Sequence, residues 1–313
     1  MPPYPISATG APASARRDLL WLALAFGLLY FFVLGRPPLA NPDEGRYAEI
    51  PREMVASGDW VTPRLNGVPY FEKPPLVYWA EAAAIELLGP GEGALRSIPA
   101  LFALGGVLLA YAAGRELFGR EAGLGAAAVL GSSLLYFALG RLLLLDLVVS
   151  VLMAATLFCF ILGVRAPPGR RRRALFHGLY ASAALATLAK GLIGFLLTGA
   201  VMFLWLLLFN QWKRLRPLHL PTGLLLFLAL AAPWHLLVSE MPYGVPKAKL
   251  IEQIAQLIAD KKLPILADVK DESDEAVRLV LEPRARTVDP DLLLESLYRL
   301  TDLEVRFPLN LNV

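Results

Sequence analysis

Seven apolar stretches of 16 to 19 residues occupy most of the sequence between residues 18 and 238. A helix that crosses a bilayer needs about 20 mostly apolar residues, and in lipid a helix is one of the few structures that pair all their backbone polar groups. The series therefore predicts a mostly α-helical bundle with about seven membrane spans. The stretches are 18–35, 95–113, 122–140, 146–164, 174–189, 192–210 and 220–238.

The composition agrees with a membrane protein and excludes several other classes. Hydrophobic residues make up 56% of the chain and charged residues 18%, compared with about 25% charged residues in soluble domains. A single cysteine, Cys159, excludes a disulfide-rich secreted fold, and the high apolar content excludes disorder. The spacing of cysteine and histidine does not suggest a metal site.

Charged residues are distributed unevenly along the chain. Residues 1–240 contain 20 of the 30 Lys and Arg and 14 of the 27 Asp and Glu, whereas the much shorter segment 241–313 contains 10 and 13. We therefore predict three parts. They are a cytoplasmic tail over residues 1–17, a membrane domain over residues 18–240, and a small soluble α/β tail over residues 241–313.

Basic residues predict the orientation, because the cytoplasmic loops of membrane proteins are enriched in Lys and Arg. The segment 75–89 is apolar but short, and it contains Glu81 and Glu86. If it crossed the membrane, Arg170–Arg173 would lie outside. If it lies in the interface as an amphipathic helix, this run and two other basic loops lie inside. The second arrangement predicts a cytoplasmic N-terminus and an external loop over residues 36–94.

The external loop contains acidic and basic side chains that suit chemistry on an anionic lipid head group. Asp43 and Glu44 lie just beyond the first apolar stretch, Arg46 follows them, and Glu72-Lys73 precedes two prolines. A carboxylate can accept a proton, while Arg and Lys can bind phosphate oxygens and stabilise a phosphate leaving group. The alternative is an ordinary solvated loop with surface charges.

Two further ionisable residues lie at the predicted outer ends of apolar stretches. Asp146 interrupts an apolar run that follows Arg141, and Lys190 lies at a turn between two runs. Ionisable groups at membrane depth are costly and usually face a cavity or a partner, so an anionic ligand would explain Lys190. The alternative is that both are end residues whose charged groups reach the membrane surface.

Three motifs in the external loop resemble those of a known family. They are Asp43-Glu-Gly-Arg-Tyr47, Ser57-Gly-Asp-Trp60 and Tyr70-Phe-Glu-Lys-Pro-Pro-Leu-Val-Tyr-Trp79. Together they are similar to the first periplasmic loop of the aminoarabinose transferases, which are protein mannosyltransferase-like GT-C glycosyltransferases of bacterial inner membranes. The resemblance covers about residues 15–240, and it continues through Arg96-Ser-Ile-Pro99, Gly114–Gly119, Arg141–Asp146, Ala189-Lys-Gly191 and Pro233-Trp234.

This resemblance implies a multi-pass inner-membrane enzyme that transfers a sugar from a polyprenyl-phosphate donor to lipid A or a protein at the periplasmic face. It implies that Asp43 is the essential acidic residue and that Asp146 is the second acidic residue of the site. Glu72 matches a residue implicated in binding a divalent metal, whose usual histidine partner lies later in the chain. The expected substrate-binding residues are Glu44, Arg46, Tyr47, Lys73 and Lys190.

The tail resembles a different protein, the A subunit of topoisomerase IV. The resemblance implies a part of the DNA-gate region beyond the nucleophilic tyrosine, so DNA cleavage is not expected. The tail has more acidic than basic residues and is a poor electrostatic match to nucleic acid. Its pattern predicts a helix over 250–260, a strand over 278–282 and a helix over 289–301. The matching segments are Pro242–Val245, Leu250–Ala255, Lys261-Lys262, Asp268–Glu275, Arg278–Glu282 and Arg286–Val313.

Two family resemblances that meet near residue 240 predict a chimeric chain. The aminoarabinose transferases continue through further spans beyond the matched part, so activity of this chain is an open question. Two alternatives to an active transferase therefore stay open. One is a non-catalytic membrane protein fragment, and the other is a DNA-binding module carried by the tail.

Overall fold

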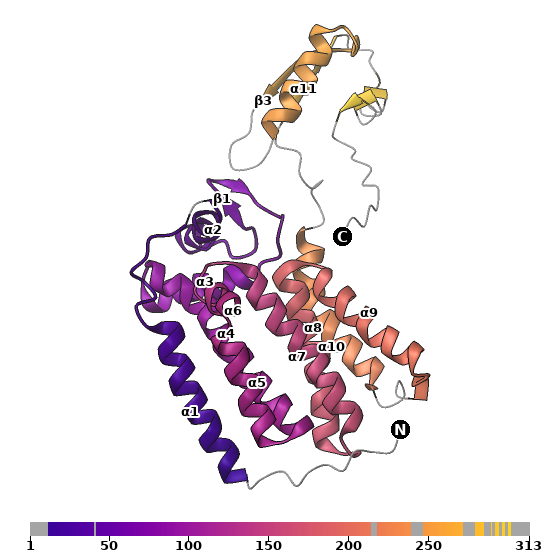
Figure 1. Cartoon of the computed structure of the whole chain (residues 1–313). Coiled ribbons are helices and arrows are strands. Elements are labelled where there is room, and N and C mark those ends of the chain that lie inside the picture. The colour runs from indigo at the N-terminus through magenta and orange to yellow at the C-terminus, as the bar shows by residue number, and fades with distance from the viewer. Residues whose placement is uncertain are drawn as a thin grey trace. The chain divides into compact units, whose positions relative to one another are not determined.

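The computed structural model describes residues 12–40, 42–213, 218–238, 247–271 and 279–284, together with a few residues between 289 and 301. The chain divides into two compact units, Met1–Val238 and Ser239–Val313. The first unit is a bundle of helices with a small folded loop region, and the second contains a helix and a two-stranded sheet (Figure 1).

Long helices form the body of the first unit. Short connections make consecutive helices pack as antiparallel neighbours, and this holds for the contacting pairs α4–α5 and α7–α8. The helices are α1 (Pro12–Phe31), α4 (Glu92–Phe118), α5 (Arg120–Ser132), α6 (Leu134–Leu139), α7 (Leu145–Arg165), α8 (Arg170–Lys190), α9 (Ile193–Leu208) and α10 (Leu220–Val238).

Helices lie over all seven predicted apolar stretches, but one stretch is broken. The expected span over 122–140 is divided into α5 and α6, because Ser133 has an extended backbone (ψ 132°) and its side chain accepts a hydrogen bond from the backbone N–H of Tyr136. Such a serine is a typical helix N-cap. Sequence periodicity alone missed this break.

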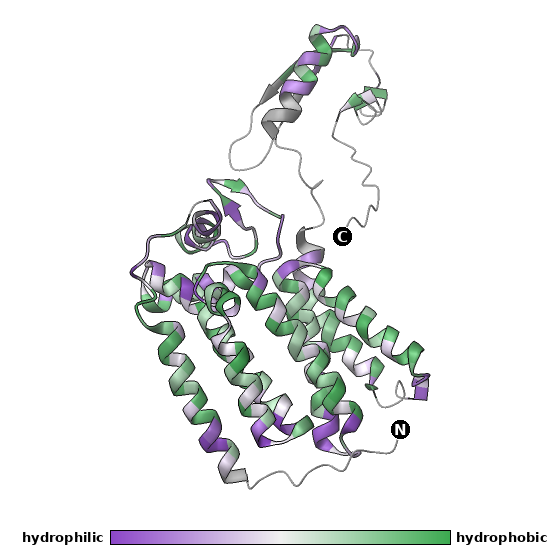
Figure 2. Cartoon of the chain, viewed as in Figure 1, coloured by the Kyte–Doolittle hydropathy of each residue, from purple (hydrophilic) through white to green (hydrophobic). Residues whose placement is uncertain are grey.

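Two helices of the described residues, α4 and α7, are long and apolar enough to cross a membrane by length and composition. Shorter apolar helices cover Ile193–Leu208 and Leu220–His235. The mostly helical fold predicted from the sequence is therefore confirmed, whereas the crossing of a membrane by all seven stretches stays a prediction. Hydrophobic residues cover the bundle helices, and hydrophilic residues gather at their ends (Figure 2).

The expected external loop is a folded region. It contains α2 (Asp43–Ser57), a hairpin of β1 (Arg64–Leu65) and β2 (Val68–Pro69), and α3 (Leu76–Leu88). The hairpin turn is Asn66-Gly67, where both residues have positive φ angles of 54° and 78°, as a type I′ turn requires. With 13 residues, α3 is too short to span a bilayer. It packs against α2 and α4.

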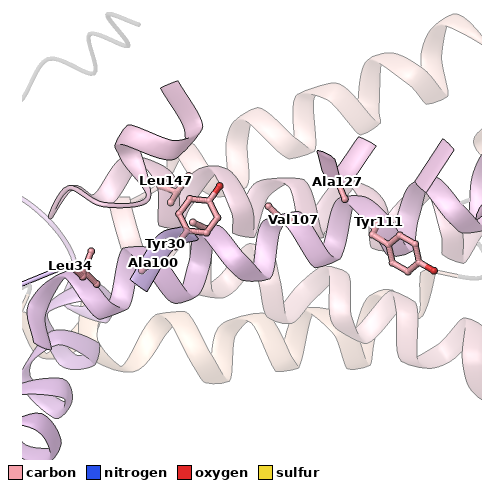
Figure 3. Close-up of a cluster of buried hydrophobic side chains, with 8 residues drawn as sticks. Tyr30, Leu34, Ala100, Val107, Tyr111, Ala127 and Leu147 are labelled. Carbon is pink, nitrogen blue, oxygen red and sulfur yellow. The ribbon is translucent and has the colours of Figure 1, made fainter. Parts of the chain in front are cut away.

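A cluster of buried side chains joins α1 to α4, α5 and α7 (Figure 3). Tyr30 is fully buried in it, and its hydroxyl donates a hydrogen bond of 3.0 Å to the carbonyl of Gly131. This bond satisfies the one polar atom that the ring brings into the core. The labelled members in Figure 3 are Tyr30, Leu34, Ala100, Val107, Tyr111, Ala127 and Leu147.

Replacing Gly123 with alanine is expected to destabilise the α4–α5 contact by about 1–3 kcal/mol, the usual cost of overpacking. A Cβ atom there would lie 2.7 Å from the backbone nitrogen of Arg115 and 2.7 Å from the backbone oxygen of Tyr111. Gly125 is the matched control on the same helix, because a Cβ atom there meets nothing within 4 Å. Thermal melting of both variants checks the prediction, and equal melting temperatures would contradict it.

The second unit contains α11 (Lys247–Ala259), β3 (Leu266–Asp271) and β4 (Leu279–Pro283). The two strands pair antiparallel, and the sequence did not predict β3. The helix expected over 250–260 overlaps α11, and the strand expected over 278–282 overlaps β4. Their ends differ by one to three residues. Six of the 13 residues of the helix expected over 289–301 lie outside the described residues, so the α/β fold of the whole tail stays a prediction.

Candidate functional site

The first turn of α2 places two neighbouring acidic residues on different sides of the helix. Asp43 is exposed, whereas Glu44 is only 2% exposed. Residues three and four positions apart share a helix face, so Asp43 lies on the same face as Arg46 and Tyr47. Acidic residues in a first turn are also favourable, because the N-terminus of a helix carries a partial positive charge.

Glu44 forms a buried ion pair with Arg96, which begins the apolar part of α4. The Glu44 Oε2 atom lies 2.7 Å from Arg96 Nη2, and Oε1 lies 2.9 Å from Nε. The same carboxylate accepts hydrogen bonds from the backbone N–H groups of Ala40 (2.7 Å) and Leu143 (2.8 Å). Three parts of the chain therefore meet at one carboxylate, namely residues 40–44, Arg96 and Leu143.

Arg96 extends the same network to the chain that leaves α1. Its guanidinium donates to the carbonyls of Pro37 at 2.6 Å, Pro38 at 3.0 Å and Leu34 at 3.4 Å. Burial acts to raise the pKa of Glu44, but the hydrogen bonds from Arg96 and from two backbone N–H groups lower this pKa below its ordinary value. The pair therefore stays charged and hydrogen-bonded although it is buried.

A second group of charged and polar side chains contains Arg46 of α2 and Tyr70, Glu72 and Lys73 of the following loop. The Tyr70 hydroxyl donates a hydrogen bond of 2.6 Å to Glu72 Oε2, and Lys73 Nζ lies 3.2 Å from Glu72 Oε1. These two contacts lower the pKa of Glu72, chiefly through the hydrogen bond from Tyr70. Burial and the neighbouring Glu72 carboxylate raise the pKa of Tyr70 to about 12. Contact with the Tyr70 hydroxyl raises the pKa of Arg46.

Tyr47 connects this group to the start of α7. Burial raises the pKa of its phenol, and the charges of Glu72, Asp43 and Asp146 add to this effect while that of Arg46 opposes it. Its ring also stacks on Tyr78, with ring centroids 6.4 Å apart. Asp146, in the first turn of α7, forms an ion pair with Lys190 at the end of α8.

The structure thus gathers most of the residues that the sequence singled out. The charges of Asp43, Arg46, Glu72 and Asp146 all act on the pKa of Tyr47. Lys73 forms an ion pair with Glu72, and Lys190 forms one with Asp146.

Glu44 differs from its expected role, because its buried carboxylate faces Arg96 and backbone N–H groups rather than the open side. Sequence reasoning assigned no role to Arg96 or Tyr70. A charged Arg96 beside an apolar stretch is a usable signal, because such a charge needs a partner.

The residues that the structure describes do not contain a group of three His, Cys, Asp or Glu that could hold a metal ion. Glu72, the residue expected at a metal, instead contacts Tyr70 and Lys73. An ammonium group beside the carboxylate does not suit a cation. The described residues therefore do not fit a divalent metal.

The fold and the site define a membrane-type helix bundle with acidic residues beside several fixed cations at one end. The model of the dolichyl-phosphate-mannose-protein mannosyltransferase family matches residues 72–236. The chain belongs to this family.

Curated relatives and solved structures give the same result for the first unit. The undecaprenyl phosphate-alpha-4-amino-4-deoxy-L-arabinose arabinosyl transferase of Edwardsiella ictaluri is 31% identical over 70% of this chain and 40% of its own length. The crystal structure of ArnT from Cupriavidus metallidurans in the apo state is 36% identical, with a TM-score of 0.65, over 72% of this chain and 42% of that one. The same protein bound to undecaprenyl phosphate also matches with a TM-score of 0.65. The chain therefore spans about two fifths of the length of these relatives.

The end of the chain matches a different family. The model of the A subunit of DNA gyrase/topoisomerase IV matches residues 229–313. The A subunit of DNA topoisomerase 4 from Rickettsia bellii is 52% identical over 80 residues, which are 26% of this chain and 11% of the relative. The chain therefore joins segments of two families, as the sequence predicted, and the two matched ranges overlap only within residues 229–236.

Proposed function

We propose that the first unit is a glycosyltransferase that transfers a sugar from a polyprenyl-phosphate donor to a hydroxyl of lipid A or of a protein. The observation that carries this proposal is the placement of Asp43 on the same helix face as Arg46. Two further cations, Lys73 and Lys190, form ion pairs with Glu72 and Asp146, whose charges act on the neighbouring Tyr47. The similar protein with undecaprenyl phosphate bound supports the choice of donor lipid.

In the proposed reaction Asp43 accepts the proton of the acceptor hydroxyl. The hydroxyl oxygen then forms a bond to the anomeric carbon of the sugar, and the bond from that carbon to the phosphate oxygen breaks. The polyprenyl phosphate leaves with the electron pair. Arg46, Lys73 and Lys190 stabilise its negative charge. Asp146 holds Lys190 in place through their ion pair, and Tyr47, whose phenol is affected by the charges of Asp43, Arg46, Glu72 and Asp146, contacts the substrate.

The proposed location is the inner membrane of a bacterium, with the site at the periplasmic face. Basic residues support this orientation. The end of the bundle opposite Asp43 has ten described Lys and Arg and only three described Asp and Glu, and such an end faces the cytoplasm. We define this basic end by Arg16, Arg17, Arg115, Arg120, Arg165, Arg170, Arg171, Arg172, Arg173 and Lys213, with Asp18, Glu116 and Glu121.

We propose a domain boundary at about residue 240, which lies beside the division between the two compact units. No activity is proposed for the segment that resembles topoisomerase IV, because it matches only about a tenth of those relatives. Nucleic acid is therefore not a proposed partner of this chain.

Binding of undecaprenyl phosphate to the purified full chain tests the donor site. Replacing Arg46 or Lys73 with alanine is expected to weaken this binding about tenfold or more, because each charge-assisted hydrogen bond to a phosphate is worth about 1.4 kcal/mol or more. Arg64→Ala is the matched control, since Arg64 lies in the same loop region and pairs with Asp59 at 3.4 Å. Native mass spectrometry measures the bound lipid. Equal losses in all three variants would contradict a specific phosphate site.

A further inference from the structure

A cavity lies between α7, α8, α9 and α10, and it extends to Trp212 and Leu218 near the basic end of the bundle. It has a volume of about 360 Å³, which lies in the usual range of ligand pockets. The lining residues come from Phe160 of α7, the middle of α8, most of α9, the first half of α10, and Trp212 and Leu218 between α9 and α10. Leu179, Tyr180 and Ala183 line the cavity from the middle of α8, and this helix ends at Lys190 of the candidate sugar-transfer site.

The wall of this cavity suits a hydrocarbon chain. Aromatic and aliphatic side chains such as Phe160, Met202 and Phe227 form most of it. The two hydroxyls among the lining residues are already used, because Thr198 Oγ1 donates to the carbonyl of Gly194 at 2.8 Å and the Tyr180 hydroxyl donates to that of Leu218 at 3.1 Å. Neither hydroxyl therefore has a hydrogen left to donate to a polar ligand.

A cation lies beside the same helices at the basic end. The guanidinium of Arg172 lies 5.8 Å from the ring centre of Phe176, and Phe176 packs in one cluster with Leu179 and Leu218, which line the cavity. Among the described residues, the buried Nε atom of Arg172 has no hydrogen-bond partner. Because this Nε atom is buried, a phosphate would bind the terminal nitrogens of the guanidinium, whose planar fork of N–H donors suits phosphate oxygens.

The surroundings of Arg172 favour an anion as well. The basic run Arg170–Arg173 forms the first turn of α8, whose N-cap residue Gly169 provides no side-chain hydrogen bond. The free N–H groups of a helix N-terminus attract negative charge. His177 and His219 lie close by, with ring centres 6.0 Å apart. Basic pockets between helices at a membrane surface are typical sites for anionic lipid head groups.

We propose that this cavity binds one acyl chain of an anionic phospholipid from the membrane leaflet at the basic end, with the lipid phosphate at Arg172. The apolar wall takes the chain, and the excess positive charge selects an anionic head group over a zwitterionic one. The bound lipid would fill the gap between α9 and α10 and hold these helices against α8. The site is separate from the proposed sugar transfer and does not depend on it.

Native mass spectrometry of the purified full chain with phosphatidylglycerol and phosphatidylethanolamine tests the proposal. We expect one phosphatidylglycerol to stay bound under conditions that remove phosphatidylethanolamine. Gly199→Leu is expected to reduce the bound lipid about tenfold or more, because Gly199 lines the cavity and a Cβ atom there meets nothing within 4 Å. Gly105→Leu is the matched control, since Gly105 is an exposed glycine of α4 with the same open space around it.

The head-group contact is tested by Arg172→Gln, with Arg17→Gln as the control at the same end of the bundle. Loss of a charge-assisted hydrogen bond is expected to weaken phosphatidylglycerol binding about tenfold in the first variant. Arg17 is exposed, and its loss is expected to change binding by less than about twofold. Circular dichroism of each variant shows whether the helices are retained.

A separate measurement on the otherwise unchanged chain keeps the proposal falsifiable if a variant does not fold. Phosphatidylglycerol with brominated acyl chains should quench the fluorescence of Trp212, which lines the cavity, and the quenched signal should be lost in Trp212→Phe. Equal binding of phosphatidylethanolamine, or full binding by Gly199→Leu, would overturn the proposal. Displacement by inorganic phosphate alone, or by undecaprenyl phosphate through the same residues, would also overturn it.

Discussion

Replacing Asp43 with asparagine is expected to lower the rate of sugar transfer by about 10²- to 10⁴-fold, the usual contribution of a positioned acid or base. Asparagine keeps the size of the side chain but cannot accept the acceptor proton. Binding of undecaprenyl phosphate should change little, because in the proposed site the cations and not Asp43 bind the phosphate. The measurement is turnover of a polyprenyl-phosphate-linked sugar by the full chain, together with lipid binding.

Glu86→Gln is the control for the Asp43 variant. Glu86 is an exposed carboxylate on α3, so its loss should leave the rate unchanged. Equal rates in the chain with Asp43 and the Asp43→Asn variant would contradict the catalytic role of Asp43. A chain that binds the donor lipid without any turnover would instead contradict the transferase function and favour the fragment hypothesis.

Replacing Arg96 with methionine is expected to destabilise the first unit by about 3–5 kcal/mol, because it leaves the charge of Glu44 buried without its partner. Both side chains of the pair are 3% exposed. The variant also removes the donors to the carbonyls of Pro37 and Pro38. Chemical unfolding followed by circular dichroism measures this loss.

The control for the buried pair lies on α2, the helix that carries Glu44. Arg52 and Glu49 form an ion pair there in which the arginine side chain is 56% exposed. Exposed pairs are worth about 0–1 kcal/mol, so Arg52→Met should cost far less than Arg96→Met. Similar costs for the two variants would contradict the structural importance that we assign to the buried pair.

Acidification should also weaken the buried pair. The pKa of Glu44 is lower in the folded state than its ordinary value, so the stabilisation from its charge is fully present above the pKa of the unfolded chain. As the pH falls through the lowered pKa of the folded state, Glu44 becomes protonated and this stabilisation is lost. The loss should be absent in Glu44→Gln, which has no charge to protonate.

The Glu44–Arg96 pair also explains how the fold positions the candidate site. Glu44 directly follows Asp43, and it binds the backbone N–H of Leu143, which lies shortly before Asp146 in the chain. One buried carboxylate therefore fixes the start of α2 relative to the start of α7. We propose that Glu44 and Arg96 position the two candidate acidic residues and do not contact the substrate.

Apolar patterning predicted the helical class and the approximate place of every long helix, because burial in lipid or in a core depends on local composition. The roles of Asp43, Arg46 and Lys73 are implied by the resemblance to the aminoarabinose transferases, and they stay predictions. The break between α5 and α6 was missed, because a single N-cap hydrogen bond at Ser133 decides it. Strand β3 was missed as well, because pairing with β4 across the intervening chain stabilises it.

The sequence by itself determined that this chain is a membrane-type helix bundle joined to a more charged tail, because apolar content and charge are properties of each segment alone. The second family was indicated by the resemblance of residue motifs in the tail. Only the tertiary structure decided which charged residues face one another. In the folded chain Glu44 is buried against Arg96, whereas Asp43 is exposed. The physical reason is that adjacent helical residues point in different directions, and the partner of a buried charge comes from a distant part of the chain.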